Sequence, residues 1–349
     1  MTDPALRIVA GSASPGLAGA VADHLGVDSD GCLLERYPDG ELRPALEDVC
    51  GADVYVVQPT SPPVNDHIVE LLLLLDACRR ARAARVTAVV PYFGYARQDR
   101  RTAAGQALGS TVVADAIAGA GADRLVIVDP HTPGLEAQCR IPVETLTAVP
   151  GLSGKLAAEL PDAAVVVAPD LGAVKLAERY AAVLHGPVAV VRKRRESGTA
   201  VGALDVAGTV RGRPAVIVDD MITTGATIEA AAKLLRLRGA AADIVVAATH
   251  ALLVHAAADR LRDLDLRRVL VTDTIAPCGR HRDPGVLDRA DVGRGHRLFA
   301  HRSAALGTTH AGTVMHRRLA PVLPHQEPPT GRLPCGVTSR KVLITNSRV

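Results

Sequence analysis

The chain has 349 residues, of which 48% are hydrophobic and 22% are charged, and its formal net charge is +3 at pH 7. This length suits two domains, each with its own core. No apolar run approaches the roughly 20 residues that cross a bilayer, and the leucines of 71–75 are bounded by Glu70 and Asp76. The segment after Met1 has no basic-then-apolar layout of a signal peptide. We therefore expect a cytoplasmic protein without a membrane partner.

Cysteine spacing argues against a zinc-binding protein, and charge distribution argues against a nucleic-acid-binding protein. The six cysteines are scattered, with no CxxC pair and no zinc-type cluster, so they predict free thiols. Residues 279–349 hold 12 Lys+Arg against 4 Asp+Glu, so the basic charge lies there and residues 1–278 are net acidic. Only 2% of the residues are aromatic, which leaves few side chains for base stacking. We expect no nucleic-acid partner.

Short Val- and Ile-rich runs alternate with amphipathic segments along most of the chain. The runs are 7–10, 53–58, 86–91, 124–129, 164–169, 187–191, 215–220, 243–248 and 268–272. Continuous apolar strands separated by helical segments are typical of parallel sheets covered on both faces. The sequence therefore predicts an α/β protein.

The alternation divides the chain into two domains and a tail. Pro and Gly residues interrupt it in PVETLTAVPGLSG (142–154), and four or five strands lie on each side. After Pro277 the alternation stops. We predict doubly wound, mainly parallel domains at 1–145 and 146–278, followed by an irregular tail at 279–349.

The stretch VIVDDMITTGATIEAA (216–231) joins a predicted strand to a predicted helix through two acids and a small, hydroxyl-rich loop. At such a join the backbone N–H groups of the helix start can bind a phosphate, and small residues let the phosphate approach. Asp219 and Asp220 would repel phosphate but suit neighbouring sugar hydroxyls. The stretch predicts a phosphorylated sugar site; the alternative is an ordinary turn with an acidic helix cap.

At these residues the chain resembles a known family. VIVDDMITTGATI is similar to the phosphate loop shared by type I phosphoribosyltransferases and ribose-phosphate pyrophosphokinases. RYPDGE (36–41), PYFGYARQDR (91–100) and VDPHTPGLEAQCRIPVE (128–144) resemble the pyrophosphokinases, whose first domain supplies an ATP site. The resemblance covers about residues 6–277. It implies two domains of phosphoribosyltransferase-like type, the first on the ATP side and the second on the ribose 5-phosphate side.

The resemblance also implies a role for each residue that matches a family motif. The ATP-binding residues would be Asp39, Gly40, Glu41, Arg97 and Gln98. The metal-binding residues would be His131 and Asp170. The ribose 5-phosphate site would contain Arg195, Asp219, Asp220, Thr223, Thr224, Gly225, Ala226 and Thr227. Lys193 and Arg195 would be catalytic.

Elementary chemistry agrees with several of these roles. Arg97 offers a planar fork of donors that suits triphosphate oxygens. Lys193 and Arg195 directly follow a predicted buried strand, where active-site loops emerge, although a basic run of this kind is also typical of a solvated surface. His131 and Asp170 each follow a strand, and a carboxylate supplies the oxygen that Mg²⁺ prefers.

The implied activity is transfer of the β,γ-diphosphoryl group of MgATP to the 1-hydroxyl of ribose 5-phosphate. The implied partners are ATP and ribose 5-phosphate, the implied cofactor is Mg²⁺, and the implied assembly is a homo-oligomer built from dimers, with a hexamer as one form. Two alternatives stay open: a type I phosphoribosyltransferase, and a weak or inactive regulatory homologue. The second is favoured by TAAGQALGS (102–110), which replaces the family's basic loop, and by the unusual tail.

Overall fold

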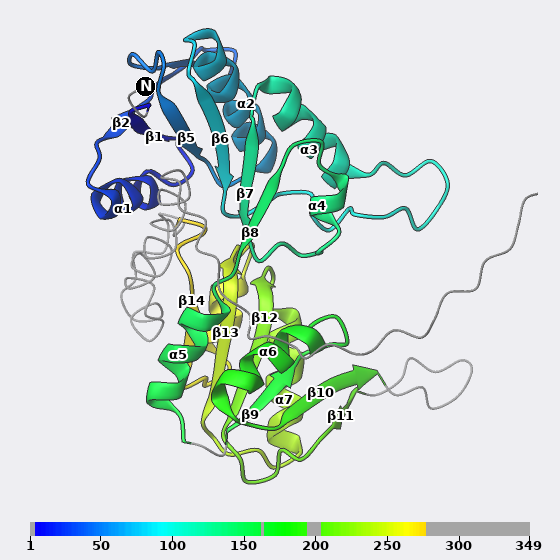
Figure 1. Ribbon diagram of the computed structural model, residues 1–349. Coiled ribbons are helices and arrows are strands. Elements are labelled where there is room, and N and C mark those ends of the chain that lie inside the picture. The colour runs from blue at the N-terminus through cyan, green and yellow to red at the C-terminus, as the bar shows by residue number, and fades with distance from the viewer. Residues whose placement is uncertain (1–3, 162–163, 194–203, 277–349) are drawn as a thin grey trace, which may run out of the picture. The chain divides into compact units, whose positions relative to one another are not determined.

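The computed structural model describes residues 4–161, 164–193 and 204–276 (Figure 1). The predicted tail at 279–349 and Arg195 lie outside these residues. Within the described part of the chain, no helix combines the length and apolar character needed to span a membrane.

The first half forms a six-stranded parallel sheet in the order β2-β1-β5-β6-β7-β8. Its strands are β1 (Leu6–Ala10), β2 (Ser29–Gly31), β5 (Asp53–Val57), β6 (Arg85–Val90), β7 (Arg124–Val128) and β8 (Val143–Leu146). The helices of this half are α1 (Pro15–Leu25), α2 (Val64–Arg80), α3 (Gly109–Ala120) and α4 (Leu135–Gln138). An antiparallel hairpin, β3 (Leu33–Arg36) with β4 (Leu42–Ala45), stands apart from this sheet.

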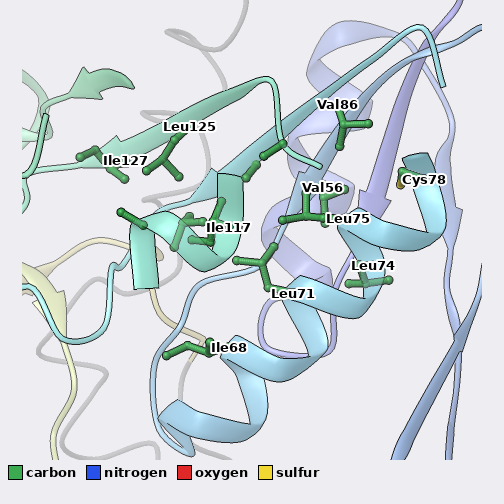
Figure 2. Close-up of a cluster of buried hydrophobic side chains, with 14 of the residues drawn as sticks. Val56, Ile68, Leu71, Leu74, Leu75, Cys78, Val86, Ile117, Leu125 and Ile127 are labelled. Atoms are coloured by element: carbon green, nitrogen blue, oxygen red, sulfur yellow. The ribbon is translucent and has the colours of Figure 1, made fainter. Parts of the chain in front are cut away.

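Helical periodicity explains how α2 covers this sheet. Leu71, Leu74, Leu75 and Cys78 recur at the spacing of one helix face, and all four are fully buried. Figure 2 shows these side chains beside strand and α3 residues of the same cluster, among them Ile117. A second cluster, formed with α1, covers the opposite face of the strands. The strands are therefore buried on both sides, as their continuous apolar runs predict.

The second half forms another six-stranded sheet, in the order β11-β10-β9-β12-β13-β14. All pairs in it are parallel except β10 with β11. Its strands are β9 (Val165–Ala168), β10 (Val188–Lys193), β11 (Leu204–Ala207), β12 (Ala215–Ile222), β13 (Ile244–Ala251) and β14 (Arg268–Val271). The helices are α5 (Val149–Glu159), α6 (Val174–Leu184), α7 (Ala226–Leu237) and α8 (Ala257–Arg262).

The predicted α/β class with two mainly parallel sheets is confirmed, but the sequence underestimated the strands. Short edge strands such as β2 and β11 were missed, because they lack long apolar runs. PVETLTAVPGLSG is no break in the alternation: it contains β8 and most of α5, with Pro150 in the first turn of that helix, where proline is tolerated. The division at residue 145 falls inside β8 and stays a prediction.

Each sheet has a topological switch point, which is a strand whose following connections lead to neighbouring strands on its two opposite sides. In the second sheet β9 lies between β10 and β12, so the loops after β9 and β12 leave the sheet side by side. Ligands of open α/β sheets bind at such points. The fold therefore brings residues 169–173 beside the end of β12, where Asp219 and Asp220 lie.

Candidate active site

The loop 223–227 joins β12 to α7 through a left-handed glycine. Gly225 caps the helix with φ 73°, a conformation that strains any residue with a Cβ. The N–H of Ala226 lies 3.5 Å from Thr224 Oγ1, and Thr224 and Thr227 are exposed. The loop thus presents hydroxyls and a helix start to solvent, as the sequence predicts for a phosphate-binding loop.

Arg260 of α8 supports this loop and was missed by sequence reasoning. Its guanidinium donates to the carbonyl of Thr224, and its Nε lies 2.8 Å from Oε2 of Glu229 on α7. The N–H of Val254 donates to the carbonyl of Thr223 over 3.0 Å. Arginine is so frequent in this chain that no sequence signal separates Arg260 from surface arginines.

The acidic pair lies at the end of β12, in a half-buried position. Burial and the neighbouring charge of Asp220 raise the pKa of Asp219 to about 8. Burial acts against ionisation of Asp220 too, but the hydrogen bond and charge of His131 outweigh it and lower the pKa of Asp220. The two acids are therefore unequal: Asp220 ionises more readily than Asp219.

His131 follows β7 of the first sheet and reaches this acidic pair. Its Nδ1 lies 2.7 Å from Asp220 Oδ2, so residues 89 positions apart meet at one place. The hydrogen bond to Asp220 raises the pKa of His131. This contact joins the VDPHTP segment to the VIVDD segment.

A buried hydrogen bond stabilises the same junction, by which we mean the place where the segment of His131 meets the ends of β12 and β13. Asp129 directly precedes the Pro130–His131 segment and has φ 35°, which is strained for a residue with a Cβ. Its Oδ2 accepts a hydrogen bond of 2.8 Å from Thr249 Oγ1 at the end of β13, and another of 2.8 Å from the N–H of Ala148. Thr249 is only 1% exposed, so water does not compete for this bond.

His250 adds a second buried link. Its Nε2 donates to the carbonyl of Val128 over 3.0 Å, and its Nδ1 accepts from Thr274 Oγ1 over 2.9 Å. Burial lowers the pKa of His250, which keeps the ring neutral and consistent with these two bonds. The signal that could have found this link is the adjacent Thr-His pair at the end of a buried strand.

Asp170 lies in the exposed loop after β9, on the neighbouring strand. Its Oδ1 accepts hydrogen bonds from the N–H groups of Gly172 and Ala173, at 2.8 and 3.1 Å. Its charge contributes to the raised pKa of Asp219, which places it electrostatically near the acidic pair. No direct bond to His131 is found among the described residues, and no group of three or more His, Cys, Asp and Glu side chains there is spaced to hold a metal ion.

The YARQD turn after β6 places Arg97 and Gln98 at the surface. The N–H of Gly94 donates to Thr60 Oγ1 over 2.6 Å, and a Cβ at position 94 would lie 2.8 Å from the carbonyl oxygen of Thr60. Only glycine fits this close approach. The hydrogen bond to Asp220 keeps the pKa of His131 raised, and the charge of Arg97 opposes this shift in part, so Arg97 acts electrostatically on His131.

The other predicted ATP residues lie on a separate turn. Asp39, Gly40 and Glu41 connect β3 to β4; Asp39 Oδ1 accepts from the N–H of Glu41 over 3.1 Å, and the three residues are exposed. Arg36 donates to the carbonyl of Gly40 over 3.0 Å. Among the described residues, no hydrogen bond or ion pair connects this turn to Arg97.

The predicted catalytic pair is only partly described. Lys193 is the last residue of β10, the strand beside β9, so the chain leaves this strand at the same edge of the sheet as Asp170. The Lys193 side chain and Arg195 lie outside what the structure describes.

These features define a class. Two parallel α/β sheets, the second with an acidic strand end followed by a glycine loop and a helix start, are the architecture of a phosphoribosyltransferase-like protein. Two family models match the chain: the N-terminal domain of ribose phosphate pyrophosphokinase over residues 6–121, and the phosphoribosyl transferase domain over residues 144–276.

Similar sequences and one similar solved structure identify the family within this class. A ribose-phosphate pyrophosphokinase of Gloeobacter violaceus is 43% identical over 296 residues, covering 84% of this chain and 89% of that protein. One of Staphylococcus saprophyticus is 39% identical over 275 residues, covering 78% and 85%. The crystal structure of phosphoribosylpyrophosphate synthetase from Mycobacterium smegmatis matches with a TM-score of 0.80 and 35% identity, covering 87% of this chain and 99% of that one.

The chain therefore belongs to the ribose-phosphate pyrophosphokinase family, and it is an enzyme of phosphoribosyl pyrophosphate synthesis. The family predicted from the sequence motifs is confirmed. The roles of individual site residues stay predictions.

Proposed function

We propose that this enzyme, as a cytoplasmic homo-oligomer built from dimers, transfers the β,γ-diphosphoryl group of MgATP to the 1-hydroxyl of ribose 5-phosphate and releases AMP. The observation that carries the proposal is the 2.7 Å contact between His131 Nδ1 and Asp220 Oδ2. It joins the segment that carries the predicted metal ligand His131 to the segment expected around the sugar.

The sugar side is supported by the chemistry of β12 and its loop. Gly225 and the start of α7 offer backbone N–H groups to the 5-phosphate, and the hydroxyls of Thr223, Thr224 and Thr227 add donors. Asp220, whose pKa is lowered, would accept from a ribose hydroxyl. Asp219, whose pKa is raised, can donate to one or accept from one.

The nucleotide side is supported by Arg97 and Gln98. Both are exposed, and Arg97 has no ion pair among the described residues, so its guanidinium is available to bind phosphate oxygens. The turn of Asp39, Gly40 and Glu41 would also bind ATP. That role rests on the family motif alone.

Mg²⁺ is the cofactor that these donors fit. The described side chains form no closed cage, and Mg²⁺ is typically bound by one or two protein groups together with substrate phosphates and water. Asp170 and His131 would hold it beside the acidic pair, and when bound it supplies neutralisation of the triphosphate charge. A cation here would also relieve the repulsion between the neighbouring acids Asp219 and Asp220.

Catalysis would depend on positioning and on charge. Diphosphoryl transfer requires the protein to align the sugar hydroxyl in line with the β-phosphorus. It also requires the protein to stabilise charge on the transferred group. Lys193 and Arg195, at the exit of β10, would supply that stabilisation. The acids hold the ribose so that its 1-hydroxyl faces the nucleotide.

The test is a product assay on the purified full chain with Mg²⁺, ATP and ribose 5-phosphate. The proposal predicts one AMP for each phosphoribosyl pyrophosphate, and none when ribose 5-phosphate is omitted. Release of ADP, or nucleotide binding without turnover, would contradict it. Light scattering on the same sample tests the assembly, and a monomer would contradict that part.

A further inference from the structure

A long loop follows the YARQD turn and returns to the start of α3 (Figure 1). Its two ends meet at Ser110, which is fully buried. The Ser110 N–H lies 3.3 Å and its Oγ 3.1 Å from the carbonyl oxygen of Gln98. The backbone of Gln98 is therefore tied to the first turn of a helix that packs in the core.

Gln138, the last residue of α4, joins both ends of this loop. Its Oε1 accepts from Ser110 Oγ at 2.6 Å and from Thr111 Oγ1 at 3.2 Å. Its Nε2 donates to the carbonyl oxygen of Asp99 at 3.1 Å. The Gln138 side chain therefore binds the start of α3 through its oxygen and Asp99 through its nitrogen.

The Gln98 side chain is oriented by the same helix start. A Cβ at Gly109 would lie 2.6 Å from Gln98 Oε1, so the Gln98 amide rests directly on Gly109. The tip of the loop is organised separately, because Gln106 Oε1 accepts from the N–H and the Oγ1 of Thr102 at 2.8 and 2.9 Å. The bonds of Gln138 therefore act on the base of the loop, where Arg97 and Gln98 leave the turn.

We propose that Gln138 is a positioning residue for nucleotide binding: it holds the base of the loop so that Gln98 and the adjacent Arg97 face the triphosphate. The inference rests on the proposed function, in which those two residues bind ATP. Gln138 touches no substrate in this arrangement. Its effect reaches the nucleotide through the backbone of residues 98 and 99.

The test compares Gln138→Met, which keeps the length of the side chain and removes both polar atoms, with Glu136→Gln on the exposed side of the same helix. We expect KM for ATP to rise about tenfold in Gln138→Met, equivalent to about 1.4 kcal/mol. KM for ribose 5-phosphate and kcat should stay within twofold, and Glu136→Gln should match the parent. A general structural defect would shift both KM values and kcat together.

A double-mutant cycle with Ser110→Ala locates the effect. If Gln138 acts through Ser110, the two substitutions together should raise KM for ATP by clearly less than the product of their separate effects. An unchanged KM for ATP in Gln138→Met, equal shifts for both substrates, or fully multiplicative effects would each overturn the proposal. A parent enzyme that releases no AMP would overturn the proposed function itself, whereas an active parent with an unaffected variant would overturn only the role of Gln138.

Discussion

The Thr249→Val substitution tests the buried junction beside His131. Valine fills the volume of threonine but cannot donate to Asp129 Oδ2, so the substitution removes a 2.8 Å bond between residues 120 positions apart. A hydrogen bond to a charged group contributes about 1.5–3 kcal/mol. Asp129 Oδ2 keeps the bond from the N–H of Ala148, so we expect a loss in the lower part of this range, about 2 kcal/mol.

The assay is urea unfolding of parent and variant, followed by circular dichroism, with a thermal scan alongside. A loss of about 2 kcal/mol should lower Tm by roughly 4–8 °C. Thr209→Val is the matched control, because Thr209 is exposed, and it should change the free energy of unfolding by less than about 0.5 kcal/mol. If Thr249→Val proves as stable as Thr209→Val, the Asp129 bond does not hold the two strand ends together.

Three further substitutions probe the proposed sugar site and the proposed catalytic residue Lys193. Asp219→Asn should gain in Tm relative to the parent as pH rises from 5 to 8, because folding raises the pKa of the parent's Asp219 from 3.8 to about 8 and the parent loses stability between these two values; a constant Tm difference would refute this. Gly225→Ala, at φ 73°, should cost about 1–2 kcal/mol in urea unfolding and raise KM for ribose 5-phosphate more than KM for ATP; equal shifts would contradict a phosphate-loop role. Lys193→Ala should lower kcat by roughly 100-fold or more while ribose 5-phosphate still binds in calorimetry, and an unchanged kcat would remove Lys193 from the mechanism.

Much of the fold follows from the sequence, because hydrophobic runs report burial directly. β12 is buried along its apolar part and half-buried at Asp219 and Asp220, as the change from apolar to acidic residues predicts. The edge strands are harder to predict from the sequence, since an edge strand such as β11 is only partly buried and carries no long apolar run. Proline and glycine near residue 150 were misleading, because both are compatible with the first turn of a helix.

The candidate site was only partly accessible from the sequence. The predicted phosphate loop is local, so its glycine and threonines and the nearby acids lie close together in the sequence and can be recognised together. Arg260 and Gln138 act through contacts with residues far along the chain, and no periodicity or spacing reports such contacts. Their roles became apparent only from distances between atoms.

In the proposed reaction, a pentose phosphate and a nucleoside triphosphate meet where His131 contacts Asp220. The most direct measurement is ³¹P NMR of the full chain turning over ATP and ribose 5-phosphate with Mg²⁺. We expect the β and γ phosphorus signals of ATP to reappear together as a diphosphate on carbon 1 of the ribose phosphate, in step with AMP. Transfer of the γ-phosphoryl group alone, with ADP as the product, would contradict it.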